Sequence, residues 1–287
     1  MPGGAIGVGW RPEICGMIAD LEGIAFCEVI AESLSAPAGR WRRRTGIAVP
    51  DELSALIDRG VSAVPHGISL SLGGAEAVDE QRVEHLAACA RELGSPVVSE
   101  HIAFVRAGGV EAGHLLPVPR TREALDALVR NISRTQRALD VPLAVENIAA
   151  LFEWPDAEFT EAEFLRELVE RTGVHLLLDI ANVYANARNS SRDPLTELLR
   201  LPTERLAYCH IAGGREVAGR YHDTHVHPVP AEVLALVAEF APSRPVPLML
   251  ERDGNYPPAP ELLAELNAIA AAAGRSAVTS RPEPPRT

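Results

Sequence analysis

The chain has 287 residues, of which 47% are hydrophobic, and this length suits one large domain such as an α/β barrel of roughly 250 residues. Its 39 acidic and 27 basic residues give a formal net charge of −12, which argues against electrostatic binding of nucleic acid or anionic lipid over a broad surface. All 27 basic residues are arginine, so the chain has no lysine for Schiff-base or lysine-base chemistry.

Short apolar segments alternate along the chain with longer segments of helical periodicity, which gives eight strand–helix pairs. Strands are predicted at residues 5–10, 25–31, 62–66, 97–101, 143–147, 175–179, 206–210 and 247–251. Helices are predicted near residues 12–22, 50–59, 76–94, 121–138, 160–172, 192–200, 230–241 and 260–273. Thr160 and Glu163 have the spacing of a helix capping box.

The predicted strands have the composition of a parallel sheet that is covered on both faces. Residues 176–178 are three leucines in a row, whereas a strand with one face in solvent would alternate. Eight repeats predict a closed (β/α)8 TIM barrel over residues 1–275, with its active site at the C-terminal rim of the strands. Residues 276–287, rich in proline and arginine, are predicted to form a disordered tail.

Six successive predicted strands end in a histidine or a carboxylate, which predicts a metal site at the barrel rim. These residues are His66, His101, Glu146, Asp179, His210 and Glu251, and the segment 223–228 adds Asp223 and His225. An open doubly wound sheet would gather its ligands at one crevice, so six strand ends favour a barrel. Imidazole and carboxylate without thiolate suit iron, manganese or zinc, and eight ligands are enough for two or three ions.

Some of these residues carry more specific expectations. Glu146 follows apolar residues, and a buried carboxylate needs a positive partner, so we expect it to bridge two ions. His225 and His227 would point to opposite sides of an extended segment, so His225 is the one expected to bind metal with Asp223. Asn182 would add an amide oxygen or orient a ligand, unless it is only a turn residue. The residues expected to act in catalysis are Glu146, Asp179 and Asp223.

The remaining features favour a cytoplasmic protein. No apolar run approaches the roughly 20 residues that span a bilayer, and the first residues lack the basic and apolar segments of a signal peptide. The four cysteines show no short paired spacing, so neither a disulfide framework nor a zinc knuckle is predicted. The basic run at residues 40–44 is expected to be a solvated loop, with binding of an acidic peptide or a phosphate as the alternative.

The order of these motifs resembles that of the multinuclear non-heme iron-dependent oxidative enzymes (MNIO), which include the methanobactin biosynthesis oxidase. The resemblance covers nearly the whole chain outside the tail. It depends on residues 7–13 (GVGWRPE), His66 with residues 69–73 (SLSLG), and residues 99–101 (SEH), 146–147 (EN), 178–182 (LDIAN), 210–213 (HIAG), 223–228 (DTHVHP) and 251–253 (ERD).

The resemblance implies a TIM barrel that holds two or three irons in mixed Fe(II)/Fe(III) states. With O2 as co-substrate, such an enzyme modifies a residue, often cysteine, of a ribosomally synthesised precursor peptide in natural-product (RiPP) biosynthesis. The ligand set that it implies is His66, His101, Glu146, Asp179, Asn182, His210, Asp223, His225 and Glu251. It also implies a separate protein that delivers the peptide leader. Because a closed barrel has no exposed sheet edge, the leader is expected to bind loops, outer helices or that partner.

Other functions on the same fold remain alternatives. A sugar isomerase or epimerase and a zinc AP endonuclease-like hydrolase would share the barrel and its metal site. The negative charge disfavours an endonuclease, and the lack of lysine disfavours an isomerase that uses lysine for proton transfer. A non-catalytic metal- or peptide-binding subunit is a third alternative, although all eight ligand positions carry residues that can bind metal.

Overall fold

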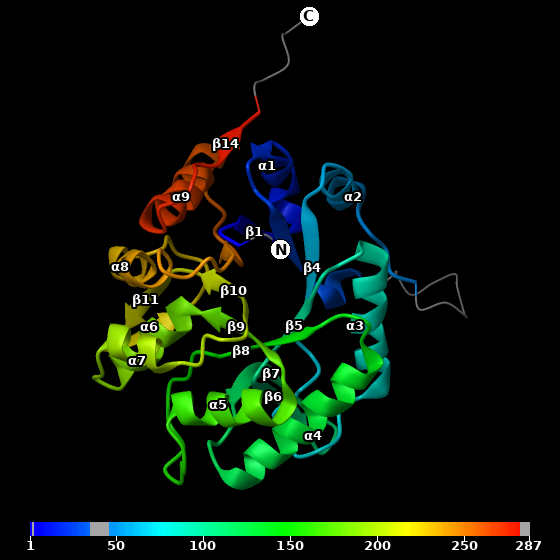
Figure 1. The fold of residues 1–287 in the computed structure, drawn as a ribbon, viewed down its shortest axis with the longest axis vertical. Coiled ribbons are helices and arrows are strands. Elements are labelled where there is room, and N and C mark those ends of the chain that lie inside the picture. Colours follow the sequence, from blue (N-terminus) through cyan, green and yellow to red (C-terminus); the bar gives the residue numbers. More distant parts are fainter. Residues whose placement is uncertain (2, 35–45, 282–287) are drawn as a thin grey trace, which may run out of the picture.

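The structure is a computed structural model that describes residues 1, 3–34 and 46–281, so the basic run at residues 40–44 lies outside the described residues. Eight parallel strands close into a barrel in the order β1-β13-β10-β9-β8-β5-β4-β3 (Figure 1). They are β1 (Ile6–Trp10), β3 (Phe26–Ile30), β4 (Ser62–Gly67), β5 (Val98–His101), β8 (Leu143–Glu146), β9 (His175–Asp179), β10 (Leu206–Ile211) and β13 (Leu248–Leu250). The predicted TIM barrel is confirmed, and each predicted strand overlaps one strand of the barrel.

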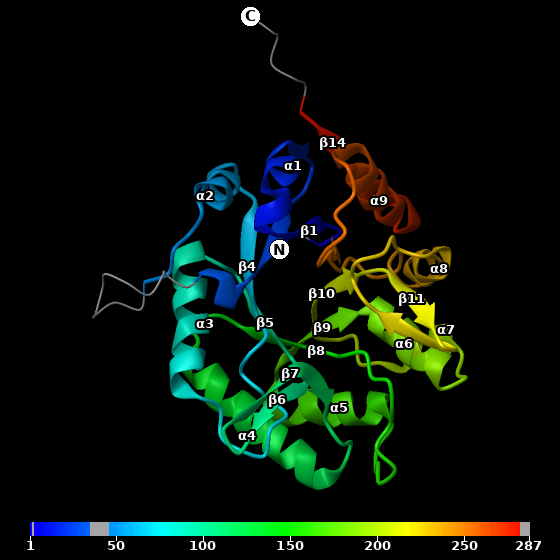
Figure 2. The same cartoon turned by 180° about the vertical axis from the view of Figure 1, so that it is seen from behind.

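Helices surround the barrel on its outside (Figures 1 and 2). They are the 3-10 helices η1 (Pro12–Ile14) and η2 (Ala31–Leu34), and α1 (Cys15–Ala19), α2 (Asp51–Asp58), α3 (Glu80–Leu93), α4 (Arg122–Ala138), α5 (Glu161–Thr172), α6 (Ile180–Asn189), α7 (Pro194–Arg200), α8 (Ala231–Phe240) and α9 (Ala259–Ala272). The capping box of Thr160 and Glu163 is confirmed at the start of α5. Helix α6 was not predicted; it begins directly after β9 because the Asp179 carboxylate accepts a hydrogen bond from the Asn182 N–H.

Short antiparallel strand pairs lie outside the barrel. They are β6 (Ala103–Ala107) with β7 (Val110–Pro117), β11 (Gly214–Val217) with β12 (Arg220–Asp223), and β2 (Leu21–Glu22) with β14 (Thr279–Ser280). The barrel itself is closed, as expected, and residues 110–115 of β7 are exposed in a hairpin outside it. Part of the expected tail is ordered, because Val278 is buried and β14 pairs with β2.

The barrel interior is filled by one residue from each strand or from the position just before it. This cluster is Ala5, Phe26, Val64, Val97, Ala144, Leu177, Tyr208 and Met249. Phe26 and Tyr208 belong to strands that are not neighbours, yet their ring centroids are 5.7 Å apart, so they meet across the interior. The residues that alternate with this cluster, such as Val98, Val145 and Leu178, belong to a second, larger core that includes the helices. The two cores together fix the eight strand ends relative to one another.

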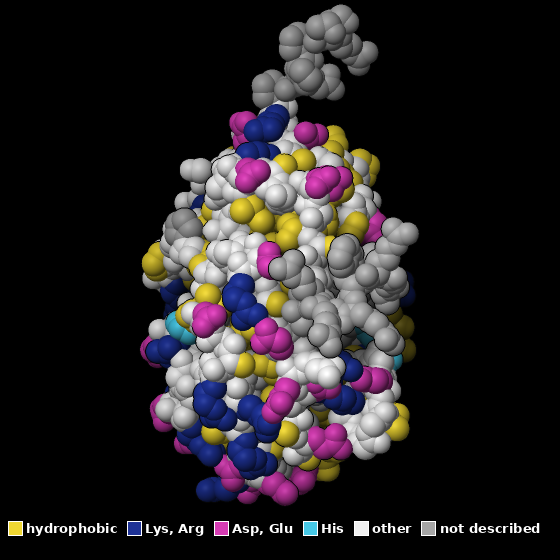
Figure 3. Space-filling model, turned by 90° about the vertical axis from the view of Figure 1, so that its right-hand side faces the viewer, with side chains coloured by type: hydrophobic (Ala, Val, Ile, Leu, Met, Phe, Trp, Pro, Cys, Tyr) yellow, Lys and Arg dark blue, Asp and Glu magenta, His cyan; other side chains and the backbone are white. Residues whose placement is uncertain are grey.

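The surface has no single dominant charge on the face shown in Figure 3, where arginine and acidic side chains are interspersed. Within the described part of the chain, no helix combines the length and the hydropathy that crossing a membrane requires.

Gly7 tests the packing of the barrel interior. A Cβ atom at Gly7 would lie 2.6 Å from two carbons of the buried Phe26 ring, so we expect Gly7→Ala to lower the free energy of unfolding by about 1–3 kcal/mol. A Cβ atom at Gly16, in α1, would meet no atom within 4 Å, so Gly16→Ala is the matched control and should be neutral or stabilising. Urea unfolding of both variants measures the difference, and equal stability of the two would contradict this packing.

Candidate metal centre

The candidate metal centre lies where the inward face of the barrel changes from apolar to polar side chains. In seven strands, the residue of the interior cluster is followed two positions later by a polar residue. The pairs are Phe26/Glu28, Val64/His66, Val97/Ser99, Ala144/Glu146, Leu177/Asp179, Tyr208/His210 and Met249/Glu251. Because side chains alternate along a strand, residues two apart share one face, so these polar groups lie one layer above the apolar cluster. They are all buried.

The first candidate site, the His66 group, consists of His66, His101 and Glu146. Both histidines direct Nε2 at Glu146 Oε2 over 3.4 Å, and the two Nε2 atoms are 3.2 Å apart. Ligands that bind one ion at about 2 Å lie about 3 Å from one another, so these three atoms have the spacing of a shared ion. The residues come from the ends of the neighbouring strands β4, β5 and β8.

The second candidate site, the His210 group, consists of Glu146, Asp179, His210 and Glu251. His210 Nδ1 lies 3.3 Å from Glu146 Oε1 and 2.8 Å from Glu251 Oε2. Glu146 therefore directs one carboxylate oxygen at each of the two groups. This is the arrangement of a carboxylate that bridges two ions.

His225 lies between two further sets of ligands. One set is Asp179, Asp223 and His225, in which His225 Nε2 contacts the Asp223 carboxylate closely and lies 3.7 Å from Asp179 Oδ2. The other set is His225, Glu251 and Asp253, in which His225 Nδ1 lies 3.3 Å from Glu251 and 3.2 Å from Asp253. His225 has a φ of 54°, a left-handed conformation that is uncommon for residues other than glycine. Its position at the rim lets a third ion share ligands with the His210 group.

Buried atoms without a hydrogen-bond partner test whether these residues fit metal ions. Within the described residues, such atoms include Glu146 Oε2, Asp179 Oδ2 and Asp223 Oδ1. Every one of these three residues belongs to a candidate site. Buried polar atoms without partners are costly, and cations would satisfy all three. The donor set therefore fits two or three metal ions with nitrogen and oxygen ligands.

The histidine pKa values reflect the density of negative charge in the metal-free centre. Burial alone would lower the pKa of His101, but nearby carboxylates, above all Glu146, raise it to about 9. Burial would also lower the pKa of His210, yet Glu251, Glu28 and Glu146 raise it well above its usual value. The raised pKa values favour protonated His101 and His210, whose positive charge balances part of this negative charge.

The carboxylates of the metal-free centre divide into two kinds. Burial and the charge of Asp223 raise the pKa of Asp179 well above its usual value. Burial would also raise the pKa of Glu251, but His210 and His225 lower it well below the usual range. The raised pKa of Asp179 therefore favours a proton, or a cation, beside its carboxylate.

Asn182 and His227 make other contacts. Asn182 Nδ2 donates to the Asn147 carbonyl over 3.0 Å, and the Asn182 N–H donates to Asp179. His227 Nδ1 lies 2.7 Å from Thr224 Oγ1, and His227 belongs to none of the ligand sets. The structure thus directs His225, and not His227, toward the candidate ligands.

Sequence reasoning missed several polar residues of the centre. Glu28 and Ser99 are buried in the same layer as the ligands, and Tyr208 is buried in the apolar cluster below. Asp253 joins His225 at the rim, where Arg11 contacts it over 2.7 Å. A signal for Glu28 and Ser99 was available, because each follows an interior apolar residue by two positions. The prediction considered only the last residue of each strand.

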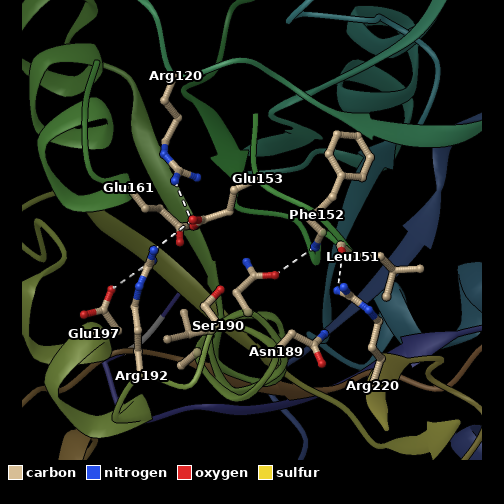
Figure 4. A pocket seen from close by; sticks show the side chains of 14 residues that line it. Arg120, Leu151, Phe152, Glu153, Glu161, Asn189, Ser190, Arg192, Glu197 and Arg220 are labelled. Carbon is tan, nitrogen blue, oxygen red and sulfur yellow. Dashed lines mark hydrogen bonds and ion pairs between the residues drawn. The ribbon is translucent and has the colours of Figure 1, made fainter. Parts of the chain in front are cut away.

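A separate pocket of about 390 Å³ lies between the segment after β8 and helices α6 and α7 (Figure 4). Arg120 and Arg192 both direct their guanidinium groups at Glu153, over 2.9 and 2.8 Å. Arg220 donates to the Leu151 carbonyl. The three arginines that line this pocket are thus bound to neighbouring groups, and none of the candidate metal ligands lines the pocket.

Comparison with known proteins identifies relatives over nearly the full chain. Residues 5–274 match the family described as RiPP precursor modification enzyme MbnB/TglH/ChrH. A UPF0276 protein of Streptomyces avermitilis is 52% identical over 272 residues, which are 92% of this chain and 54% of that protein. The chain thus spans about half the length of this relative. A UPF0276 protein of Caulobacter vibrioides is 35% identical over 280 residues, 96% of each chain.

Solved structures with the same fold have little sequence in common with the chain. Endonuclease IV from Thermus thermophilus has a TM-score of 0.58 at 17% identity and covers 93% of this chain and 98% of its own. A putative xylose isomerase from Rhodospirillum rubrum has a TM-score of 0.58 at 13% identity and covers 95% and 99%. These likenesses support the barrel fold alone.

The shared position of Glu146 predicts a large effect on metal content. Glu146→Ala removes a ligand from two groups at once, so we expect the variant to lose at least one ion per chain that the parent protein binds. His227→Ala is the control and should keep most of its metal. Elemental analysis after parallel purification without oxygen compares them, with circular dichroism as a check on folding. A full metal complement in the Glu146 variant would show that Glu146 is no bridge.

The raised histidine pKa values predict how the metal-free protein responds to pH. A group whose pKa is higher in the folded state stabilises the fold fully below its unfolded pKa and loses that contribution as the pH rises through the folded value. For His101 this window runs from 6.5 to about 9. Urea unfolding of chelator-treated protein should therefore give a falling free energy of unfolding across this window. A free energy of unfolding that does not change across this pH window would contradict the raised pKa of His101.

Proposed function

The chain belongs to the RiPP precursor modification enzyme family MbnB/TglH/ChrH, and from that membership we propose that it is a multinuclear non-heme iron oxidase that acts on a precursor peptide with O2. The residue that it modifies is expected to be cysteine. The single observation that carries the proposal is Glu146, whose two oxygens face two separate sets of nitrogen and oxygen ligands.

The ligand residues would hold the ions and set their charge. His66, His101 and Glu146 would hold one ion, and the His210 group would hold the next. Iron in two oxidation states would supply single electrons and an open coordination position for substrate and O2.

Asp179 is the proposed proton carrier of the centre, with Asp223 beside it. Asp179 is buried, whereas Asp223, the last residue of β12, and His225, two residues later, are partly exposed. Burial and the charge of Asp223 raise the pKa of Asp179, which favours its protonated carboxyl. Asp179 would therefore accept or release a proton, and Asp223 would support this catalytic role by its negative charge.

The exposed apolar side chains support a peptide as the substrate. Among the described residues, six of the seven exposed large hydrophobic side chains lie in segments that follow barrel strands at the C-terminal rim. These are Ile68, Val110, Leu115, Leu151, Phe152 and Val217. These side chains lie in segments on the same side of the barrel as the centre, where a peptide that reaches the centre would contact them. A separate leader-binding protein would use the same face, and the exposed part of β7 offers it a sheet edge.

The test is oxidation of a peptide by iron-loaded protein. Short synthetic peptides that carry either cysteine or serine at one position would be incubated with the protein under air and under argon, and mass spectrometry would follow the product. We expect a mass change only with cysteine, only under air, and at least about 100-fold slower with Glu146→Ala, because that variant lacks the shared ligand.

Other outcomes separate the alternatives. Cleavage of abasic duplex DNA by zinc-loaded protein, or conversion of xylose to xylulose, with no oxygen uptake in the presence of thiol peptides would contradict the oxidase. The likeness to endonuclease IV and to a xylose isomerase makes these two the appropriate controls.

A further inference from the structure

A continuous chain of hydrogen bonds runs beneath the candidate metal centre and joins two histidines of different groups. His66 Nδ1 lies 2.7 Å from Ser99 Oγ, and Ser99 Oγ lies 2.7 Å from the Tyr208 hydroxyl. The Tyr208 hydroxyl donates to Glu28 Oε2, and His210 Nε2 lies 2.9 Å from the same oxygen. All five side chains are buried, with at most 1% of each residue exposed.

The direction of each hydrogen bond follows from the chemistry of the groups. An ionised carboxylate only accepts, so Tyr208 O–H and His210 Nε2–H must both donate to Glu28. Tyr208 has one hydroxyl proton, which it gives to Glu28, so Ser99 must donate to the tyrosine oxygen. The Ser99 proton is then used, so Ser99 Oγ accepts from His66 Nδ1–H. Every donor in the chain therefore points toward Glu28.

This order fixes the tautomer of both histidines. His66 carries its proton on Nδ1, which leaves the lone pair of Nε2 directed at Glu146 and His101. His210 carries a proton on Nε2, so Nδ1, which is directed at Glu146 and Glu251, is the nitrogen that would bind metal. The two histidines thus present opposite nitrogens to the centre.

We propose that Glu28, through Tyr208 and Ser99, is the positioning residue that sets the tautomers of His66 and His210 and so prepares both metal groups from one buried carboxylate. This inference rests on the proposed function only in requiring that the centre binds metal. Partners of this kind orient metal-binding histidines, and their loss typically costs about 10- to 100-fold in metal affinity or activity. Glu28 belongs to no ligand set itself, so its effect passes through the histidines.

The chain makes a directional prediction that packing alone does not make. Ser99 and Tyr208 lie only on the branch to His66, so Ser99→Ala and Tyr208→Phe should weaken the His66 group and leave the His210 group unchanged. Glu28 lies on both branches, so Glu28→Gln should weaken both groups. Each affected site should lose about 10- to 100-fold in affinity.

The experiment is titration of metal-free protein with Co2+ in the absence of oxygen, followed by calorimetry and by the visible absorption of the bound cobalt. Ser95→Ala and Tyr184→Phe are matched controls. Ser95 is a buried serine that donates to the Val97 carbonyl, and Tyr184 is a buried tyrosine that accepts from Arg188. Both controls should titrate and absorb like the parent protein. Nitrogen-15 spectra of zinc-loaded protein should show the retained proton on Nδ1 of His66 and on Nε2 of His210.

Each outcome bears on one proposal. If the parent protein binds no Co2+ or Zn2+, the proposed metal function fails. If it binds metal but Ser99→Ala and Tyr208→Phe retain parental affinities and spectra, or if the two histidines retain protons on the other nitrogens, the positioning role of Glu28 is overturned while the metal function stands. Equal weakening of both groups by Ser99→Ala would likewise overturn it.

Discussion

Balancing buried negative charge is the constraint on which this structure depends. Glu28, Glu146, Asp179 and Glu251 are each at most 4% exposed and lie within one layer of the barrel. Isolated buried carboxylates would cost several kcal/mol each, so positive charge has to be present at the same place. Arg11 contacts Glu251 over 3.5 Å, but the histidines must carry protons or the centre must carry cations to complete the balance. The proposed metal ions meet this requirement and also satisfy the buried atoms that have no protein partner.

The barrel meets this constraint with the simplest property of a strand, the alternation of its side chains. One inward position of each strand contributes to the apolar interior cluster, and in seven strands the next inward position carries a polar group. The interior cluster packs against the polar layer from below, and the hydrogen-bond chain of Glu28, Tyr208 and Ser99 lies where the cluster and the layer meet. Above the layer, the segments after β10 and β12 add Asp223 and His225, so the open side is built from less buried residues. The packed apolar residues thus lie on one side of the polar layer, and the more exposed ligands lie on the other.

Most of the fold could be predicted from the sequence, because eight apolar segments separated by helical periods leave few arrangements other than a closed barrel. The candidate ligands at the ends of β4, β5, β8, β9 and β10 could also be predicted, because each is a carboxylate or an imidazole that follows an apolar run. Helix α6 could not be read, because its start depends on the Asp179 side chain, which was considered only as a ligand. The short hairpins β6–β7 and β11–β12 contain little apolar periodicity, so the sequence predicts no strands there. Glu28 and Tyr208 were missed because their role depends on contacts between β3 and β10, strands that are distant in the sequence.

Metal content of protein purified without oxygen, measured by elemental analysis together with Mössbauer spectroscopy, tests the central claim most directly. The expected result is two or three irons per chain, partly ferrous and partly ferric, with spectra of coupled rather than isolated ions. Stoichiometric zinc that persists after expression in iron-rich medium, or a single iron per chain, would contradict an iron centre bridged by Glu146.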